Sequence, residues 1–337
     1  MSLVEGAAAP GTVVGIGASA GGVDALIGVV RELPSDFAAA ICVVLHVPSS
    51  GRSLLASILG RHTRLTVAEA RDGQKLRPGH IYVAPNDRHL TVSGSRVQLD
   101  RGPKENGVRP AVDVLFRTVA AACGPRSIAV VLSGALGDGS AGAVAVHHAG
   151  GAVIAQNPEE ATVASMPESA IRAVGDAVTV LDAAAIGPTL ARMIEPVRED
   201  MAQVDSENPL SETSERPDGP PSPFTCPECS GPLWELRHGE VVRYRCRVGH
   251  SYTEDAMVIE QGSALEAALW SALEALEERA EFLRRVANRY GERRPRLRDR
   301  FNGGAGDALE RAELIRRALG TQGDGPHALD PQAEVAE

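Results

Sequence analysis

The chain has 337 residues, of which 43% are hydrophobic, and it carries a net charge of −10. This length gives room for about two domains with a sizeable buried core. The acidic balance argues against nucleic acid or an anionic membrane surface as a partner, because both require clustered Lys and Arg. No stretch approaches the roughly 20 apolar residues of a membrane helix or has the pattern of a leader peptide. We therefore expect a cytoplasmic protein without membrane insertion, whose partners are proteins or small molecules.

Short apolar runs alternate with helical segments between residues 11 and 192. Expected strands lie at 13–16, 40–45, 81–84, 128–132, 152–155 and 177–181, and helical spacing is clear at 23–30, 112–122 and 141–149. Several of these strands are apolar throughout, which is typical of a sheet covered on both faces. The fold class predicted is α/β, a doubly wound and mostly parallel sheet with helices on both faces. Residues 89–100 predict a hairpin added to that sheet.

The rest of the chain divides by composition. We expect a flexible N-terminus at 1–10, an acidic Ser/Pro-rich linker at 193–222, a small cysteine-containing module at 223–253, a helical segment at 254–320 and a disordered tail at 321–337. In the helical segment, leucine and alanine recur every three or four residues on both sides of a break expected at Pro295 and Gly303-Gly304. This spacing predicts a helical hairpin, with a coiled-coil homodimer as the alternative.

The stretch VVGIGASAGGVDAL, residues 13–26, fits two incompatible signatures. Its GxGxxA pattern is that of a dinucleotide site, and its GxSxG pattern is that of a nucleophile elbow centred on Ser19. A dinucleotide site needs an acidic residue at the end of the second strand, but that strand, at 40–45, is followed by His46. Because neighbouring parallel strands end at one crevice, Ser19 and His46 are expected to face each other as nucleophile and base.

A third member of such a site follows the expected strand at 128–132. The loop SGALGDGSAG contains a single acid, Asp138, which would orient the histidine and stabilise the imidazolium. Each residue has a plainer interpretation. Ser19 could be an N-cap, His46 could bind a loop carbonyl, and Asp138 could cap the next helix. Their arrival at one edge of the sheet favours a Ser-His-Asp triad, in a chain order that differs from that of α/β-hydrolases.

Three cysteines and a histidine cluster beyond the linker. The pairs Cys226-x2-Cys229 and Cys246-x3-His250 have the spacing of a tetrahedral zinc site, and the alternating segment between them predicts a hairpin. We expect a zinc-ribbon-like module with one structural zinc, since four protein ligands leave no position open for water. The alternative is reduced cysteines in an irregular loop. Cys42 and Cys123 are isolated, so no disulfide framework is expected.

Six segments also carry a family resemblance. They are GIGASAGG, LHVPSS, PGHIYVAPNDRHL, RPAVDVLFRTVA, LSGALGDGSAGA and IAQNPEEATVASMPESAI. Together, over residues 11–192, they resemble the catalytic domain of the chemotaxis protein-glutamate methylesterases, the CheB type. The resemblance implies hydrolysis of γ-glutamyl methyl esters on the cytoplasmic helices of chemoreceptors, giving glutamate and methanol without a catalytic cofactor. In some members it also implies deamidation of glutamine.

Carried over by position, the resemblance makes Ser19 the nucleophile, His46 the base and Asp138 the orienting acid. The backbone around Ala135 falls where the family places an oxyanion donor. Ala20 stands where relatives often have threonine, so only its backbone would assist. Chemotaxis members carry a phosphorylatable receiver domain before the catalytic domain. Only residues 1–10 precede it in this sequence, so we expect control to come from elsewhere.

Two other functions stay open from the sequence. The same hydrolase chemistry could act on a glutamine amide or another protein ester. Alternatively, the protein could be a non-catalytic signalling scaffold whose zinc and helical segments recruit a sensor kinase or a methyltransferase.

Overall fold

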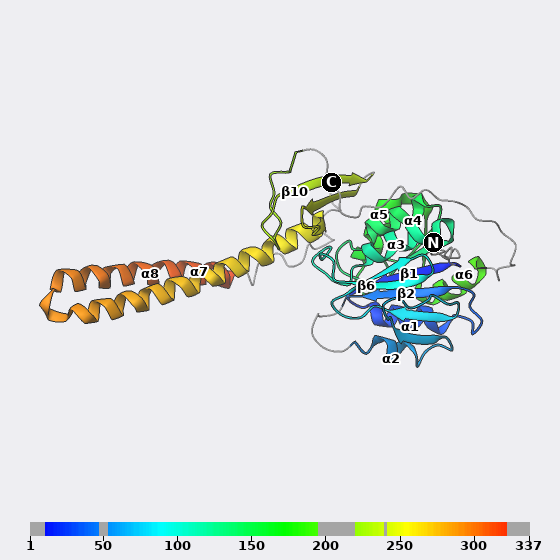
Figure 1. Cartoon of the computed structure of the whole chain (residues 1–337), viewed down its shortest axis with the longest axis horizontal. Coiled ribbons are helices and arrows are strands. Elements are labelled where there is room, and N and C mark those ends of the chain that lie inside the picture. The colour runs from blue at the N-terminus through cyan, green and yellow to red at the C-terminus, as the bar shows by residue number, and fades with distance from the viewer. Residues whose placement is uncertain (1–10, 47–52, 195–219, 239–240, 322–337) are drawn as a thin grey trace, which may run out of the picture. The chain divides into compact units, whose positions relative to one another are not determined.

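A seven-stranded parallel sheet forms the centre of the N-terminal part of the chain (Figure 1). The structure is a computed structural model that describes residues 11–46, 53–194, 220–238 and 241–321. The strand order is β3-β4-β2-β1-β7-β8-β9. These strands are β1 Val13–Ala18, β2 Ala40–Leu45, β3 Thr66–Glu69, β4 His80–Val83, β7 Ser127–Val131, β8 Ala152–Gln156 and β9 Val178–Leu181. The winding reverses between β1 and β7, which confirms the doubly wound fold class.

Helices cover both faces of this sheet, as predicted. They are α1 Gly22–Arg31, α2 Leu55–Leu59, α3 Val112–Cys123, α4 Ser140–His148, α5 Ser165–Val174 and α6 Ala183–Met193, with short 3-10 turns at Gly124–Arg126 and Gly175–Ala177. On one face, α1 and α6 bury Leu26 and Leu190 against the strands. On the other face, α3 and α5 bury Phe116 and Met166. The sheet is therefore shielded from water on both sides, which accounts for its continuously apolar strands.

Two strand predictions need correction. Strand β3 was not expected, because its four residues are mostly exposed and form no apolar run. The hairpin of β5 His89–Ser93 and β6 Arg96–Asp100 forms a separate two-stranded sheet instead of joining the large one. The edge position beside β4 is already occupied by β3. The hairpin packs on α3 instead, where the Val92 N–H donates to Thr118 Oγ1 at 3.1 Å.

The glycine of the N-terminal motif at position 17 is required by helix packing. A Cβ atom on Gly17 would lie 2.2 Å from Cγ1 of Val112, the first residue of α3. Real Cβ atoms do not approach other atoms so closely, so a side chain there would force α3 away from β1. Packing of α3 thus explains this glycine without a bound dinucleotide.

The cysteine-containing module, defined here as residues 220–258, contains a three-stranded antiparallel sheet. Its strands are β10 Leu233–His238, β11 Val241–Cys246 and β12 Ser251–Thr253, in that order. Leu233, Cys246 and Tyr252 lie in a small core beneath it. Chain contacts place this module in the same compact unit as the large sheet, and a second unit begins at Ile259.

The predicted helical hairpin is present, and all of it except the first residues of α7 lies in the second unit. Helix α7, Glu254–Tyr290, and helix α8, Pro295–Thr321, are joined by a 3-10 turn at Gly291–Arg293 and pack through Ala280 and Ala308. The break expected at Gly303-Gly304 is wrong, because both glycines lie inside α8. Each costs only about 1 kcal/mol in a helix interior, which packing against α7 can offset. Pro295 takes the first position of α8, where a missing N–H costs little.

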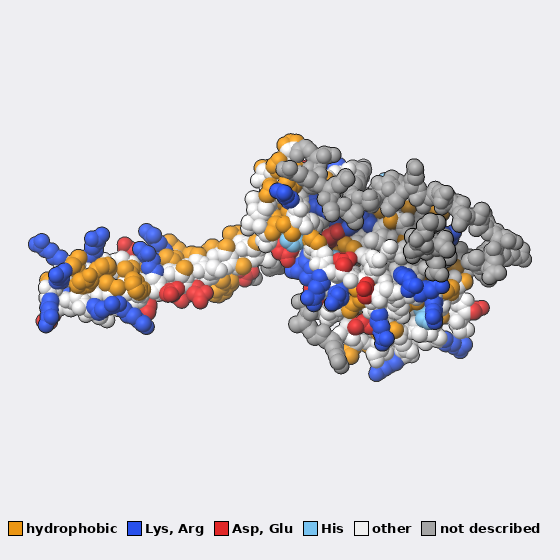
Figure 2. All heavy atoms as spheres, in the orientation of Figure 1, with side chains coloured by type: hydrophobic (Ala, Val, Ile, Leu, Met, Phe, Trp, Pro, Cys, Tyr) orange, Lys and Arg blue, Asp and Glu red, His pale blue; other side chains and the backbone are white. Residues whose placement is uncertain are grey.

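Hydrophobic side chains remain exposed along this hairpin, as Figure 2 shows. The large ones include Leu265, Trp270, Phe282 and Leu314. Homodimerisation through them stays a prediction. The predictions for residues 1–10, for most of the linker and for the tail fall outside the described residues. No helix in the described part of the chain is long and apolar enough to cross a membrane.

The contact between β1 and α3 gives a stability prediction. We expect Gly17→Ala to lower the free energy of unfolding by about 1–3 kcal/mol, because the new methyl group overpacks the Val112 side chain. Urea unfolding of the full chain measures the change. Gly11→Ala is the matched control, because nothing lies within 4 Å of its Cβ position. Equal stability of the two variants would contradict this view of the contact.

Candidate active site

Ser19 and His46 follow the carboxyl ends of neighbouring strands, β1 and β2. The Ser19 N–H donates to the Ser133 carbonyl at 2.9 Å, and the His46 N–H donates to the Ala18 carbonyl at 3.1 Å. Gly134 lies directly against the serine, since a Cβ on Gly134 would come within 2.8 Å of the Ser19 Cβ. The ends of β1, β2 and β7 therefore meet at one edge of the sheet, as expected at a switch of winding direction.

The third predicted residue, Asp138, contacts His46 directly. The distance from His46 Nε2 to Asp138 Oδ2 is 2.7 Å, and the carboxylate is 1% exposed. Because Nε2 is engaged by the carboxylate, Nδ1 is the ring nitrogen left to act on Ser19. No hydrogen bond joins the Ser19 hydroxyl to His46 among the described residues. The structure thus brings two of the three side chains into contact and places the third at the same strand edge.

The plainer interpretations of these residues do not fit the geometry. The N-cap of α1 is Gly21, not Ser19. The ring of His46 binds a carboxylate and not a loop carbonyl. Asp138 does not cap the helix that follows it. Its carboxylate accepts hydrogen bonds from the N–H groups of Val112 and Asp113, at 2.7 and 3.0 Å, at the start of α3.

Helix α3 supplies a carboxylate to the start of helix α4 in the same way. Asp113, in the first turn of α3, accepts the N–H groups of Gly139 and Gly142 at 3.0 and 2.7 Å. Each helix therefore presents its unpaired N-terminal amides to a carboxylate associated with the other helix. Such amides and the helix dipole both stabilise negative charge.

The pKa values of the two carboxyl groups respond differently to this environment. Burial alone would raise the pKa of Asp138. His46 opposes this effect through its hydrogen bond and its charge, and the amides of Val112 and Asp113 add to it. Together they hold the pKa of Asp138 below its usual value. Burial raises the pKa of Asp113 to about 6, and the Arg243 guanidinium opposes this rise. Asp138 is thus kept ionised, as an acid that orients a histidine must be.

The predicted oxyanion donors, Ala20 and Ala135, are both exposed. Neither backbone N–H donates to another described residue. Their role as oxyanion donors stays a prediction.

Four polar residues around this site were missed by sequence reasoning. They are Glu105, Asn106, Asp113 and Arg243. The Glu105 carboxylate forms ion pairs with Arg117 at 2.5 Å and with Arg243 at 2.6 Å. Burial would raise the pKa of Glu105, but these two cations hold it far below its usual range. Glu105 and Asn106 lie in a loop without periodicity, and Arg243 is far away in the sequence. Asp113 alone gave a signal, as an acid at the start of a predicted helix.

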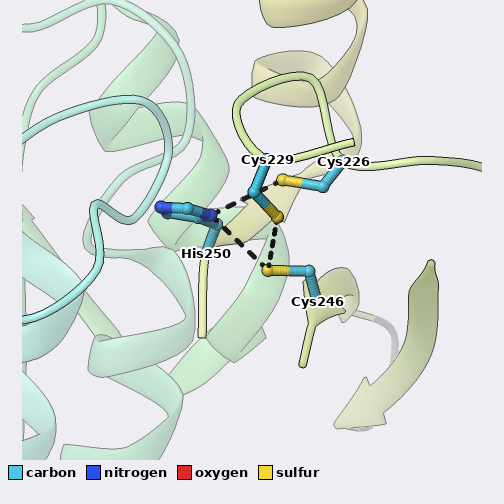
Figure 3. A group of neighbouring side chains, drawn as sticks. All are labelled: Cys226, Cys229, Cys246 and His250. Atoms are coloured by element: carbon cyan, nitrogen blue, oxygen red, sulfur yellow. Dashed lines mark hydrogen bonds between the residues drawn. The ribbon is translucent and has the colours of Figure 1, made fainter. Parts of the chain in front are cut away.

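The predicted metal ligands converge, as Figure 3 shows. Sγ of Cys226 and Sγ of Cys246 lie 3.6 and 3.5 Å from His250 Nδ1, and Sγ of Cys229 lies 3.6 Å from Sγ of Cys246. Zinc bonds of about 2.3 Å to sulfur and about 2.0–2.1 Å to nitrogen give tetrahedral edges of about 3.5–3.8 Å. The four side chains therefore fit a tetrahedral metal ion.

A carboxylate supports this cluster from outside. Glu228 Oε2 lies 3.1 Å from His250 Nε2, so the other ring nitrogen, Nδ1, is directed at the three sulfur atoms. This is the arrangement that orients metal-binding histidines. The cluster can hold a metal ion.

Comparisons with known proteins agree on the N-terminal part of the chain. The CheB methylesterase family model matches residues 14–190. A protein-glutamate methylesterase/protein-glutamine glutaminase of Yersinia pestis is 40% identical over 162 residues, which are 47% of this chain and 46% of that protein. A protein of the same description from Pectobacterium atrosepticum is 40% identical over 173 residues, 50% of this chain and 49% of that one. The chain thus spans about half the length of the curated relatives it matches.

A solved structure covers the same region. The crystal structure of the Thermotoga maritima CheB methylesterase catalytic domain aligns with a TM-score of 0.52 at 39% sequence identity. The alignment covers 55% of this chain and 99% of that domain. The likeness therefore extends over the large sheet and its helices.

Glu105 gives a pH-dependent prediction. We expect Glu105→Gln to lower the free energy of unfolding by about 3–5 kcal/mol at pH 7, because it removes the carboxylate charge that Arg117 and buried Arg243 share and leaves Arg243 only its longer contact with Asp113. The folded pKa of Glu105 lies below its unfolded value, so its stabilisation is complete above pH of about 4.3 and is lost as the pH falls further. The difference between the two proteins should therefore shrink below about pH 4.

Urea unfolding across this pH range, at matched metal content, measures the effect. Glu235→Gln is the control, because its ion pair with Arg237 is exposed and is worth less than about 1 kcal/mol. A difference between wild type and Glu105→Gln that grows as the pH falls would refute the assignment.

Proposed function

Because the chain belongs to the CheB methylesterase family, we propose that it is a serine-type protein-glutamate methylesterase. Its substrates would be γ-glutamyl methyl esters on the cytoplasmic helices of chemoreceptors, in chemotaxis or a related signalling pathway. The observation that carries the proposal is the 2.7 Å contact of His46 with Asp138 at the strand edge that also holds Ser19. The proposal places the protein in the cytoplasm, where such helices lie.

In the first half of the reaction, Nδ1 of His46 takes the proton of Ser19. The serine Oγ attacks the ester carbonyl, and the N–H groups of Ala20 and Ala135 stabilise the resulting oxyanion, each donor being worth about 3–4 kcal/mol. The imidazolium is stabilised by Asp138 and returns its proton to the departing methoxide. Methanol leaves, and the glutamyl group stays bound to Oγ as an ester.

In the second half, water replaces methanol. His46 takes a proton from the water, the hydroxide attacks the acyl-enzyme, and Oγ leaves with the proton that His46 returns. The products are a glutamate side chain on the receptor and the original serine. With a glutamine side chain, the same steps would release ammonia. This second activity is favoured by the relatives' descriptions, which include glutaminase.

Ser19→Ala tests the proposal. We expect the variant to lose at least about 1,000-fold in the rate of labelled methanol release from a methylated chemoreceptor cytoplasmic fragment, since it lacks the attacking oxygen. Ser93→Ala, in the exposed end of strand β5, should retain the wild-type rate. Equal release by wild type and Ser19→Ala would eliminate Ser19 as the nucleophile. A wild-type protein that binds the fragment without releasing methanol would favour the scaffold function.

We also propose that the Cys/His cluster binds one structural zinc ion. The tetrahedral spacing of the four ligand atoms and the support of His250 by Glu228 favour this metal. When bound, zinc would supply folding free energy to a module with a small core. The ion would take no part in ester hydrolysis.

Metal analysis tests the zinc proposal. Purified wild-type protein should contain about one zinc per chain, and Cys229→Ser should fall below about half of that. Cys123→Ala, which removes a buried thiol outside the cluster, should keep the wild-type content. Less than about half an equivalent of zinc in the wild type would contradict the assignment.

A further inference from the structure

A loop of the large domain pairs with the edge of the sheet in the cysteine-containing module. The Asn106 N–H donates to the Ser251 carbonyl at 2.7 Å, and Glu105 and Ser251 form a parallel β-bridge. Residues 104–106 thus pair with Ser251 of β12 through two backbone hydrogen bonds. This places the backbone of the module next to the residues around Asp138.

The side chain of Asn106 links the module to the candidate catalytic carboxylate. Its Oδ1 accepts the Thr253 N–H of β12 at 2.9 Å. Its Nδ2 donates to Asp138 Oδ1 at 3.0 Å and to Asp113 Oδ2 at 3.2 Å. Asn106 is 2% exposed, and both polar atoms of its amide are bonded. An amide used in this way fixes the distance between β12 and Asp138.

Two further contacts join the same parts. Arg243 of β11 lies 3.6 Å from Asp113 as well as 2.6 Å from Glu105. Leu136, in the loop between Ala135 and Asp138, packs against the small core of the module. Its φ of 65° is unusual for a leucine. Its side chain is partly buried against this core, and that packing supports the unusual backbone conformation.

We propose that Asn106 is a positioning residue, through which the cysteine-containing module holds Asp138 in place for catalysis. The module is then a structural part of the active site as well as an appended unit. This inference rests on the proposed function, because it assigns a role to Asp138 in the triad. Metal binding at the Cys/His cluster would affect the position of Asp138 through the same contacts, since His250 lies three residues from Thr253.

Asn106→Gly in the full-length protein tests the role of the side chain. Glycine tolerates the backbone φ of 52° at this position, so the change removes the amide and keeps the loop conformation. We expect kcat for methanol release to fall about 10- to 100-fold with KM unchanged, as for loss of a hydrogen bond to a charged group. The low-field proton resonance of the His46–Asp138 hydrogen bond should also broaden or disappear.

Lys104→Ala is the matched control. The Lys104 ammonium pairs with Glu228 across the same boundary at 2.7 Å but does not touch Asp138. This variant should keep both kcat and the proton resonance. If Asn106→Gly does not fold, as judged by circular dichroism, Asn106→Ser carries the same test. The serine hydroxyl is too short to bond both the Thr253 N–H and Asp138.

An Asn106→Gly protein with the wild-type kcat and an unchanged low-field resonance would overturn the inference. The resonance is recorded without substrate. It therefore tests the positioning role of Asn106 even if the wild type releases no methanol. The absence of methanol release would contradict only the proposed function.

Discussion

The buried carboxylate of Asp138 is the group on which the arrangement of the site depends. A charge without exposure to water is costly unless hydrogen bonds replace its hydration. Here His46, two amides of α3 and Asn106 do so. The amide of Val112 can reach the carboxylate because Gly17 has no side chain to hold α3 away from β1. A packing requirement in the central strand is thereby connected to the ionisation state of the candidate catalytic acid.

Buried charged groups close to Asp138 explain why the cysteine-containing module packs against this part of the large domain. Glu105, Asp113 and Asp138 are three acids in or near the protein interior, and Arg117 and Arg243 face them. One of these two cations comes from β11 of the module. Removing it would leave Asp113 and Glu105 with less compensation, and buried carboxylates without partners are strongly destabilising. The module and the catalytic domain are therefore joined by buried charge as well as by backbone pairing.

The sequence predicted much of this because the decisive residues have local signals. Ser19, His46 and Asp138 each directly follow an apolar run or lie in the glycine-rich loop after one, and the Cys/His pairs have characteristic spacing. The hairpin at 89–100 was predicted, but its separation from the large sheet and the presence of strand β3 were not, because both depend on competition for a sheet edge. The roles of Asn106 and Leu136 also lacked a signal. Thr253, the partner of Asn106 in the module, lies 147 residues along the chain, and the small core that Leu136 contacts is also far away in the sequence, so no local pattern encodes these contacts. The glycines inside α8 were misjudged because tertiary packing overrides helix propensity.

Covalent labelling of the full-length protein tests the central claim most directly, namely that the strand edge holds an activated serine. A fluorophosphonate probe reacts with a serine only where a base removes the hydroxyl proton. Peptide mapping by mass spectrometry should place the label on Ser19, and His46→Gln should abolish it. Labelling of a different serine, or equal labelling of Ser19 without His46, would contradict the account.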